Sequence, residues 1–137
     1  TFSYIVNTGF WMVPNPWINI EFNSYLEMLW SREDIVQSHE KELQSIIDYC
    51  EVNQIPLFVI VFPDLADLER FMFVSDHVLK YFGERGIPTI DVSELVKGCE
   101  KTDIVVNFQD SHPSIKTHKL VGKKLVSLIS QDSSLPN

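Results

Sequence analysis

The stretch Pro56-Leu-Phe-Val-Ile-Val-Phe-Pro63 decides the fold class that we predict for this sequence. Its six apolar residues, Leu57–Phe62, stand in an unbroken row between two prolines. Continuous rather than alternating hydrophobicity indicates a strand covered on both faces, which is typical of the centre of a parallel sheet. The run is far shorter than the roughly 20 apolar residues that a membrane-spanning helix needs. We therefore expect an α/β protein with a buried parallel strand at this position.

The residues that follow this strand predict a βαβ unit. Asp64 stands where it can cap a helix, and the apolar positions after it continue at helical spacing to about Phe82. Gly83 and Gly86 provide the end of that helix, because glycine tolerates the backbone conformation of a helix C-terminus. Pro88–Val92 reads as a second strand. A strand, a helix and a second strand in this order predict a right-handed parallel crossover.

Further helices are predicted on both sides of this unit. Ser31 followed by Asp34 resembles a capping box, and the helix that begins there is predicted to stop at Asn53. Ser93–Cys99 indicates a short helix, and Ser114 can cap the last long one. The buried stripe predicted for that last helix comprises Leu120, Val121, Leu125, Leu128 and Ile129. We found no repeat or linker, so residues 1–137 are predicted to form one layered α/β domain.

The two ends of the chain carry weaker patterns. Residues Thr1–Asn23 are aromatic and interrupted by prolines, with a short strand predicted at Tyr4–Val6. We interpret this segment as an arm packed on the core, and the alternative is that it forms part of a substrate pocket. The tail Gln131–Asn137 is polar, and we expect it to fray.

The composition excludes several classes of partner. The chain has 137 residues, with 11 Lys and Arg against 19 Asp and Glu, giving a formal net charge of −8. Nucleic acids and anionic membranes attract basic surfaces, so this balance argues against both as non-specific partners. The hydrophobic share of 45% is enough for a buried core. Two cysteines, Cys50 and Cys99, form neither a disulfide framework nor a metal-binding spacing.

The loop before the last helix holds the residues that indicate chemistry. It reads Asn107-Phe-Gln-Asp-Ser-His-Pro-Ser114, so Asp110 and His112 lie two residues apart. A carboxylate that accepts a hydrogen bond from one ring nitrogen fixes the histidine tautomer and stabilises the imidazolium that forms. The other ring nitrogen can then take a proton from a nucleophile. The pair therefore predicts a general base, His112, oriented by Asp110.

This loop resembles the last conserved block of the SGNH (GDSL) hydrolases. The residues that carry the resemblance are Asp110-Ser-His112-Pro-Ser114-x-x-x-His118, followed by Leu120, Val121, Gly122 and Leu125. The likeness covers roughly residues 33–130, and its specific part is about ten residues around His112. It implies a flavodoxin-like three-layer α/β/α fold and a Ser-Asp-His triad that hydrolyses small-molecule esters. In that triad His112 would be the base and Asp110 its orienting partner, and no cofactor or metal is expected.

The sequence departs from the family in two places. The family usually places Asp three residues before His, whereas Gln109 holds that position here and Asp110 stands two before. No Gly-Asp-Ser block is present, and the Gly-x-Asn block of the oxyanion hole is not found either. We therefore expect the nucleophilic serine to lie upstream of Thr1, in a longer protein of which this chain is the C-terminal portion. Alone, the chain is expected to have little activity.

Two other interpretations remain open. The first is a non-catalytic α/β binding or assembly module that lacks the nucleophile. A truncated sheet would expose apolar edges and faces, so the chain would bind its missing N-terminal segment or copies of itself. The second is a metal site in which Asp110, His112 and His118 are the ligands. His39 and His77 are assigned no role.

Overall fold

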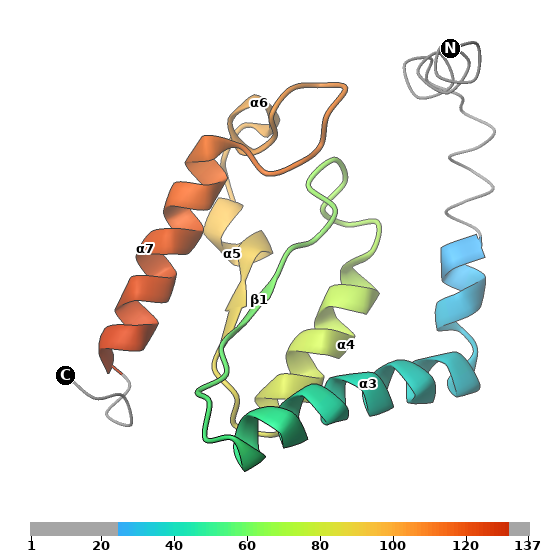
Figure 1. The fold of residues 1–137 in the computed structure, drawn as a ribbon. Helices are drawn as coiled ribbons and strands as arrows, with labels where there is room; N and C mark the ends of the chain where they lie inside the picture. The colour runs from blue at the N-terminus through green and yellow to red at the C-terminus, as the bar shows by residue number, and fades with distance from the viewer. Residues whose placement is uncertain (1–24, 132–137) are drawn as a thin grey trace, which may run out of the picture. The chain divides into compact units, whose positions relative to one another are not determined.

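The computed structural model describes residues 25–131, and Figure 1 shows the helices and strands that they form. The named elements are α3 (Glu33–Val52), β1 (Val59–Val61), α4 (Met72–Gly83), β2 (Thr89–Asp91), α5 (Val92–Val96), α6 (Lys101–Ile104) and α7 (Ile115–Gln131). The chain divides into two compact units, Thr1–Leu43 and Gln44–Asn137, with the boundary inside α3. That the chain forms a single domain stays a prediction.

The helix predicted to begin near Ser31 is confirmed as α3, but its predicted cap is wrong. Residues 25–30 are already helical, and α3 begins at Glu33. The Ser31 hydroxyl donates to the carbonyl of Met28 at 2.7 Å instead of accepting from the first turn of α3. An ion pair between Arg32 and Asp34 at 2.6 Å lies at the start of the helix. The helix therefore begins after a turn that closes the preceding helical segment.

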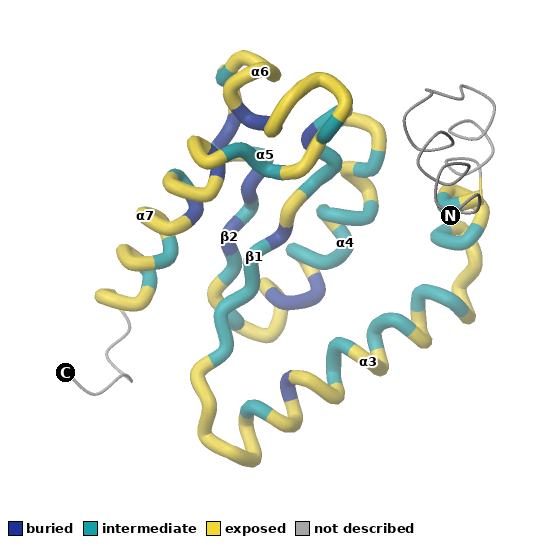
Figure 2. Tube along the Cα trace, turned by 45° about the horizontal axis from the view of Figure 1, so that its top comes forward, coloured by how far each residue is buried: buried dark blue, intermediate teal, exposed yellow. Residues whose placement is uncertain are grey.

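In the second unit, both predicted strands are confirmed, although each is shorter than predicted. β1 and β2 pair in parallel, with Ile60 opposite Ile90 at the centre of the register. The amide of Val59 donates to the carbonyl of Pro88 at 3.0 Å, which begins the ladder. Figure 2 shows α4 on one side of the two strands and α7 on the other. β1 and β2 are parallel, and α4 connects them in the chain. This is the predicted βαβ unit.

The predicted three-layer flavodoxin-like α/β/α fold is wrong for this chain. About 60% of the described residues are helical. The strands among the described residues form one parallel sheet of only two strands. Each run that predicted a strand contains only three residues that pair in the sheet. The runs are Leu57–Phe62 and Pro88–Val92. Such a sheet is too narrow for a layered fold built on a wide parallel sheet.

The helix predicted to begin at Asp64 starts much later in the structure. The Asp64 carboxylate accepts from the amide of Ala66 at 2.8 Å, so it caps a tight turn. Leu65 is buried in the core, and the chain continues through turns before α4 begins at Met72. The helical spacing of apolar residues before Met72 therefore reflects side chains buried from a loop.

The core of the second unit joins the turn after β1 to the last three helices. One cluster of buried side chains comprises Leu65, Val92, Val96, Ile104, Val105 and Val121. These residues come from the turn after β1, from α5, α6 and α7, and from Val105 directly after α6, so segments distant in sequence meet here. α5 begins where Asp91 at the end of β2 accepts from the amide of Ser93 at 2.8 Å. The core therefore holds the base of the loop that precedes α7.

Across residues 25–131, no helix has the length and apolar character required to span a bilayer. The arm Thr1–Asn23, with its predicted strand Tyr4–Val6, and nearly all of the tail lie outside the described residues.

Candidate functional site

The loop that carries Asp110 and His112 is fixed to the core at its base. Val105 and Pro113 form an antiparallel bridge, so the two ends of the loop lie side by side. The Thr117 hydroxyl donates to the carbonyl of Ile104 at 2.8 Å, and the amide of Ser114 donates to the same carbonyl at 2.9 Å. Thr117 is fully buried, so these bonds are shielded from water. The base of the loop is therefore a closed, hydrogen-bonded junction.

Ser114 caps α7 as predicted. Its hydroxyl oxygen accepts from the amide of Thr117 at 3.2 Å, which satisfies one of the free N–H groups at the helix start. The same hydroxyl donates to the carbonyl of Asp103 at 2.5 Å. Ser114 thus connects the end of the loop both to α6 and to α7.

Asn107 organises the tip of the loop. Its side-chain oxygen accepts from the amides of Gln109 and Asp110 at 2.8 and 3.0 Å. An asparagine that binds the backbone two residues on mimics a turn, which explains why this residue begins the reversal. The amide of Val106 also donates to the carbonyl of His112 at 3.0 Å. The tip therefore places Asp110 and His112 by local hydrogen bonds.

The structure brings Asp110 and His112 into direct contact. Oδ1 of Asp110 lies 2.5 Å from Nδ1 of His112 and accepts from the backbone amide of His112 at 3.0 Å. With Nδ1 donating to the carboxylate, the proton-free nitrogen of a neutral ring is Nε2. The side chain of His112 is 86% exposed and that of Asp110 is 43% exposed, so Nε2 is open to an incoming group.

Hydrogen bonds to the carboxylate set the acidity of Asp110. The backbone amide of His112 and then its ring lower the pKa of the Asp110 carboxyl below its usual value. Both groups favour the ionised carboxylate because they donate to it. Asp110 therefore remains a hydrogen-bond acceptor for the ring at neutral pH.

His118 lies away from the pair and does not complete a metal site. Its ring packs near Phe62 at the end of β1, with 6.2 Å between the ring centroids. Within residues 25–131, no three His, Cys, Asp or Glu side chains are grouped so that they can hold a metal ion. The structure thus does not bring the predicted set of Asp110, His112 and His118 together as ligands.

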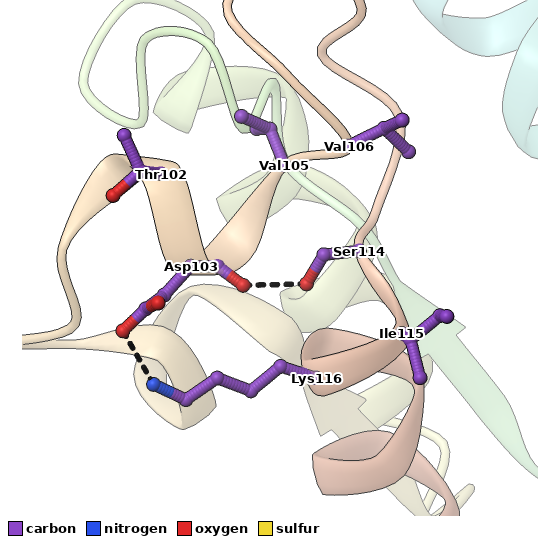
Figure 3. Close-up of a pocket in the computed structure, with 7 residues that line it drawn as sticks. All are labelled: Thr102, Asp103, Val105, Val106, Ser114, Ile115 and Lys116. Atoms are coloured by element: carbon purple, nitrogen blue, oxygen red, sulfur yellow. Dashed lines mark hydrogen bonds and ion pairs between the residues drawn. The ribbon is translucent and has the colours of Figure 1, made fainter.

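An open pocket of about 330 Å³ lies beside the loop, at the junction of α6 and α7 (Figure 3). Its lining comprises Thr102, Asp103, Val105, Val106, Ser114, Ile115 and Lys116. Nζ of Lys116 and Oδ2 of Asp103 form an ion pair of 2.6 Å at its side, and this bond raises the pKa of Lys116. Neither Asp110 nor His112 lines the pocket, so the Asp110–His112 pair and this pocket are separate features.

Sequence reasoning identified the Asp–His pair but missed the residues that hold it. Asn107 carried a detectable signal, because asparagine is among the residues that initiate turns. Thr117 carried none, since a threonine in an apolar stripe reads as ordinary helix surface or core. The double role of the Ile104 carbonyl depends on how α6 and α7 meet, which local sequence does not specify.

Comparisons with protein families, with curated proteins and with solved structures gave no match. The assignment of a function therefore depends on the site itself.

Proposed function

We propose that this chain supplies the Asp–His part of a serine-type ester hydrolase of the SGNH kind. The observation that carries the proposal is the contact between Asp110 Oδ1 and His112 Nδ1, which leaves Nε2 exposed. A ring held in this way is suited to act as a general base. The sequence resemblance around the same two residues supports the same roles.

In the proposed reaction, Nε2 of His112 takes the proton of a serine hydroxyl as its oxygen attacks the ester carbonyl. The protonated ring then gives that proton to the leaving alcohol, and an acyl-serine remains. Water repeats the sequence, with His112 again as base, and releases the acid. Asp110 stays ionised throughout and stabilises the charged ring.

The proposal places the nucleophile of this reaction outside the part of the chain that the structure describes. Among residues 25–131, no hydroxyl or thiol is hydrogen-bonded to His112, whose ring bonds to Asp110. Since the sequence also has no Gly-Asp-Ser block, the proposal keeps the expectation that the serine and the oxyanion-hole donors belong to a segment N-terminal to Thr1. Such a serine would have to approach the exposed side of the His112 ring, within about 3 Å of Nε2.

The test uses the native protein that carries this chain, with hydrolysis of p-nitrophenyl acetate as the assay. His112→Ala is expected to lower kcat/KM by about 10³-fold or more, and Asp110→Asn by about 10²-fold or more. Gln109→Ala is the matched control, because Gln109 is exposed, precedes Asp110 directly in the same loop, and keeps its backbone bond to Asn107. Equal activity of His112→Ala and the control would refute the proposal.

The isolated 137-residue chain provides a second readout. Its turnover is expected to be close to that of the His112→Ala variant, because it lacks the proposed nucleophile. Rapid turnover by the isolated chain that His112→Ala abolishes would place the nucleophile within these residues and contradict its assignment to an upstream segment.

A binding or assembly module is the alternative, and the absence of a hydroxyl bonded to the His112 ring in the described residues favours it. A serine-directed fluorophosphonate separates the two. Labelling of the native protein that requires His112 supports the hydrolase, because only an activated serine reacts rapidly. A native protein that neither reacts nor turns over esters supports the module.

A further inference from the structure

Two exposed helix surfaces of opposite charge lie in the second unit. On the C-terminal part of α3, the apolar side chains of Ile46, Tyr49 and Val52 recur every three residues and are 51%, 64% and 83% exposed. Residues at this spacing share one side of a helix. We call this the α3 surface, together with Asp48 and Glu51 along its flank.

α7 presents a second surface of the same kind. Ile115, Val126 and Ile129 are exposed on the side of α7 away from its buried residues Thr117 and Val121. Lys119, Gly122 and Lys123 lie among them by helical spacing. These six exposed residues are the α7 surface, and Figure 2 shows α7 exposed along this side.

The charges of the two surfaces are complementary. α7 contains four lysines and no acidic residue, although the chain as a whole has a net charge of −8. Lys116 is paired with Asp103, whereas Lys119 and Lys123 form no ion pair among the described residues. The part of α3 from Gln44 to Val52 contains Asp48 and Glu51 and no basic residue. Each surface thus carries the charge that the other lacks.

Gly122 supports a contact at the α7 surface. A Cβ at this position would meet nothing within 4 Å, so packing within the chain does not require glycine here. A glycine inside a helix is less favourable than alanine, and its bare backbone permits close approach of another element. Between Lys119 and Val126, the α7 surface is therefore open to close contact at the backbone.

We propose that the chain self-associates, with the α7 surface of one copy packed against the α3 surface of another. Apolar side chains form the centre of this contact, and lysines of one copy face Asp48 and Glu51 of the other. Pairing of α7 with α7 would place lysines against lysines, and pairing of α3 with α3 would oppose two acidic flanks. The heterotypic contact is therefore the one that the charges favour.

The test is sedimentation velocity of the full chain over a concentration series at low salt. The unmodified chain is expected to associate, and Val126→Asp is expected to weaken association about tenfold or more, because it buries a charge in the apolar centre. Added salt is expected to weaken the contact as well. A chain that stays monomeric over the whole series would overturn the proposal.

Charge reversal tests which surfaces meet. Lys119→Glu/Lys123→Glu makes the α7 surface acidic, and Asp48→Lys/Glu51→Lys makes the α3 surface basic. Each double variant alone is expected to be monomeric, whereas an equimolar mixture is expected to associate, because each surface then finds its opposite in the other chain. Lys80→Glu/Lys97→Glu is the matched control: it changes the net charge as the α7 variant does, at exposed positions outside both surfaces.

Each result of the mixing experiment is decisive. Restoration in the mixture supports the pairing and also shows that both variants are folded. Self-association of the α3 variant at the level of the unmodified chain would indicate α7–α7 pairing and overturn the proposal. Failure of the mixture, with far-ultraviolet circular dichroism of both variants unchanged, would overturn it too.

Discussion

The base and the tip of the loop between α6 and α7 are built in opposite ways. At the base, Ile104 is 3% exposed and Thr117 is fully buried, and their hydrogen bond is enclosed by core side chains. At the tip, Phe108 and the ring of His112 are both 86% exposed, and only local hydrogen bonds hold the backbone. The buried junction fixes the position of the loop, and the tip leaves the ring of His112 accessible. The proposed hydrolase would need both properties, because its histidine has to meet an incoming hydroxyl.

Truncation of one apolar residue in each region gives the largest expected difference. Ile104→Ala removes buried atoms from the junction and is expected to lower the free energy of unfolding by about 2–5 kcal/mol. Phe108→Ala, at the exposed tip, is the matched control and is expected to change it by less than about 0.5 kcal/mol. Urea unfolding followed by circular dichroism measures both. Equal effects would show that the base is not part of the cooperative core.

A smaller effect is expected from the hydrogen bond at the base. Thr117→Val keeps the volume of the side chain but removes the hydroxyl that donates to the carbonyl of Ile104. We expect a loss of about 1–2 kcal/mol, because that buried carbonyl then keeps only the bond from Ser114. Thr102→Val, at an exposed position of the neighbouring pocket, should change stability by less than about 0.5 kcal/mol. A neutral Thr117→Val would show that this hydrogen bond contributes nothing to the stability of the junction.

The same division explains how far sequence reasoning reached. The Asp110–His112 contact was predictable, because both residues lie within one short loop and their chemistry is local. The two strands were predictable for a similar reason, since Leu57–Phe62 carries its pattern in consecutive residues. The start of the helix predicted from Asp64 was wrong, because burial of Leu65 by other elements imitates helical spacing. The layered fold was also wrong, since the width of a sheet depends on how many strands assemble and not on one strand.

The turn at the tip is tested by its organising residue. Asn107→Ala removes the acceptor for the amides of Gln109 and Asp110 and is expected to speed their hydrogen exchange. Because these bonds are exposed, the global free energy of unfolding should fall by only about 0.5–1 kcal/mol. Asn107→Asp keeps an acceptor and serves as the conservative control, with exchange close to that of the unmodified chain. Unchanged exchange in Asn107→Ala would show that the backbone alone holds the turn.

The smallest expected effect concerns the titration of Asp110, and it separates the two donors at the tip. The carboxyl pKa of Asp110 is lowered first by the backbone amide of His112 and then by its ring. His112→Ala removes the ring but keeps the amide, so the midpoint in a carbon-detected NMR titration should rise and still stay below the usual aspartate value of about 3.9.

Because the pKa of Asp110 is lowered on folding, the stabilisation is present above the unfolded value and is lost as pH falls through the folded one. The loop should therefore loosen only below about pH 4, and Asn107→Ala should leave this midpoint nearly unchanged if the two donors from His112 are sufficient. A midpoint at the ordinary value in the unmodified chain would show that the carboxylate does not accept these bonds in solution, and the orienting role of Asp110 would lose its basis.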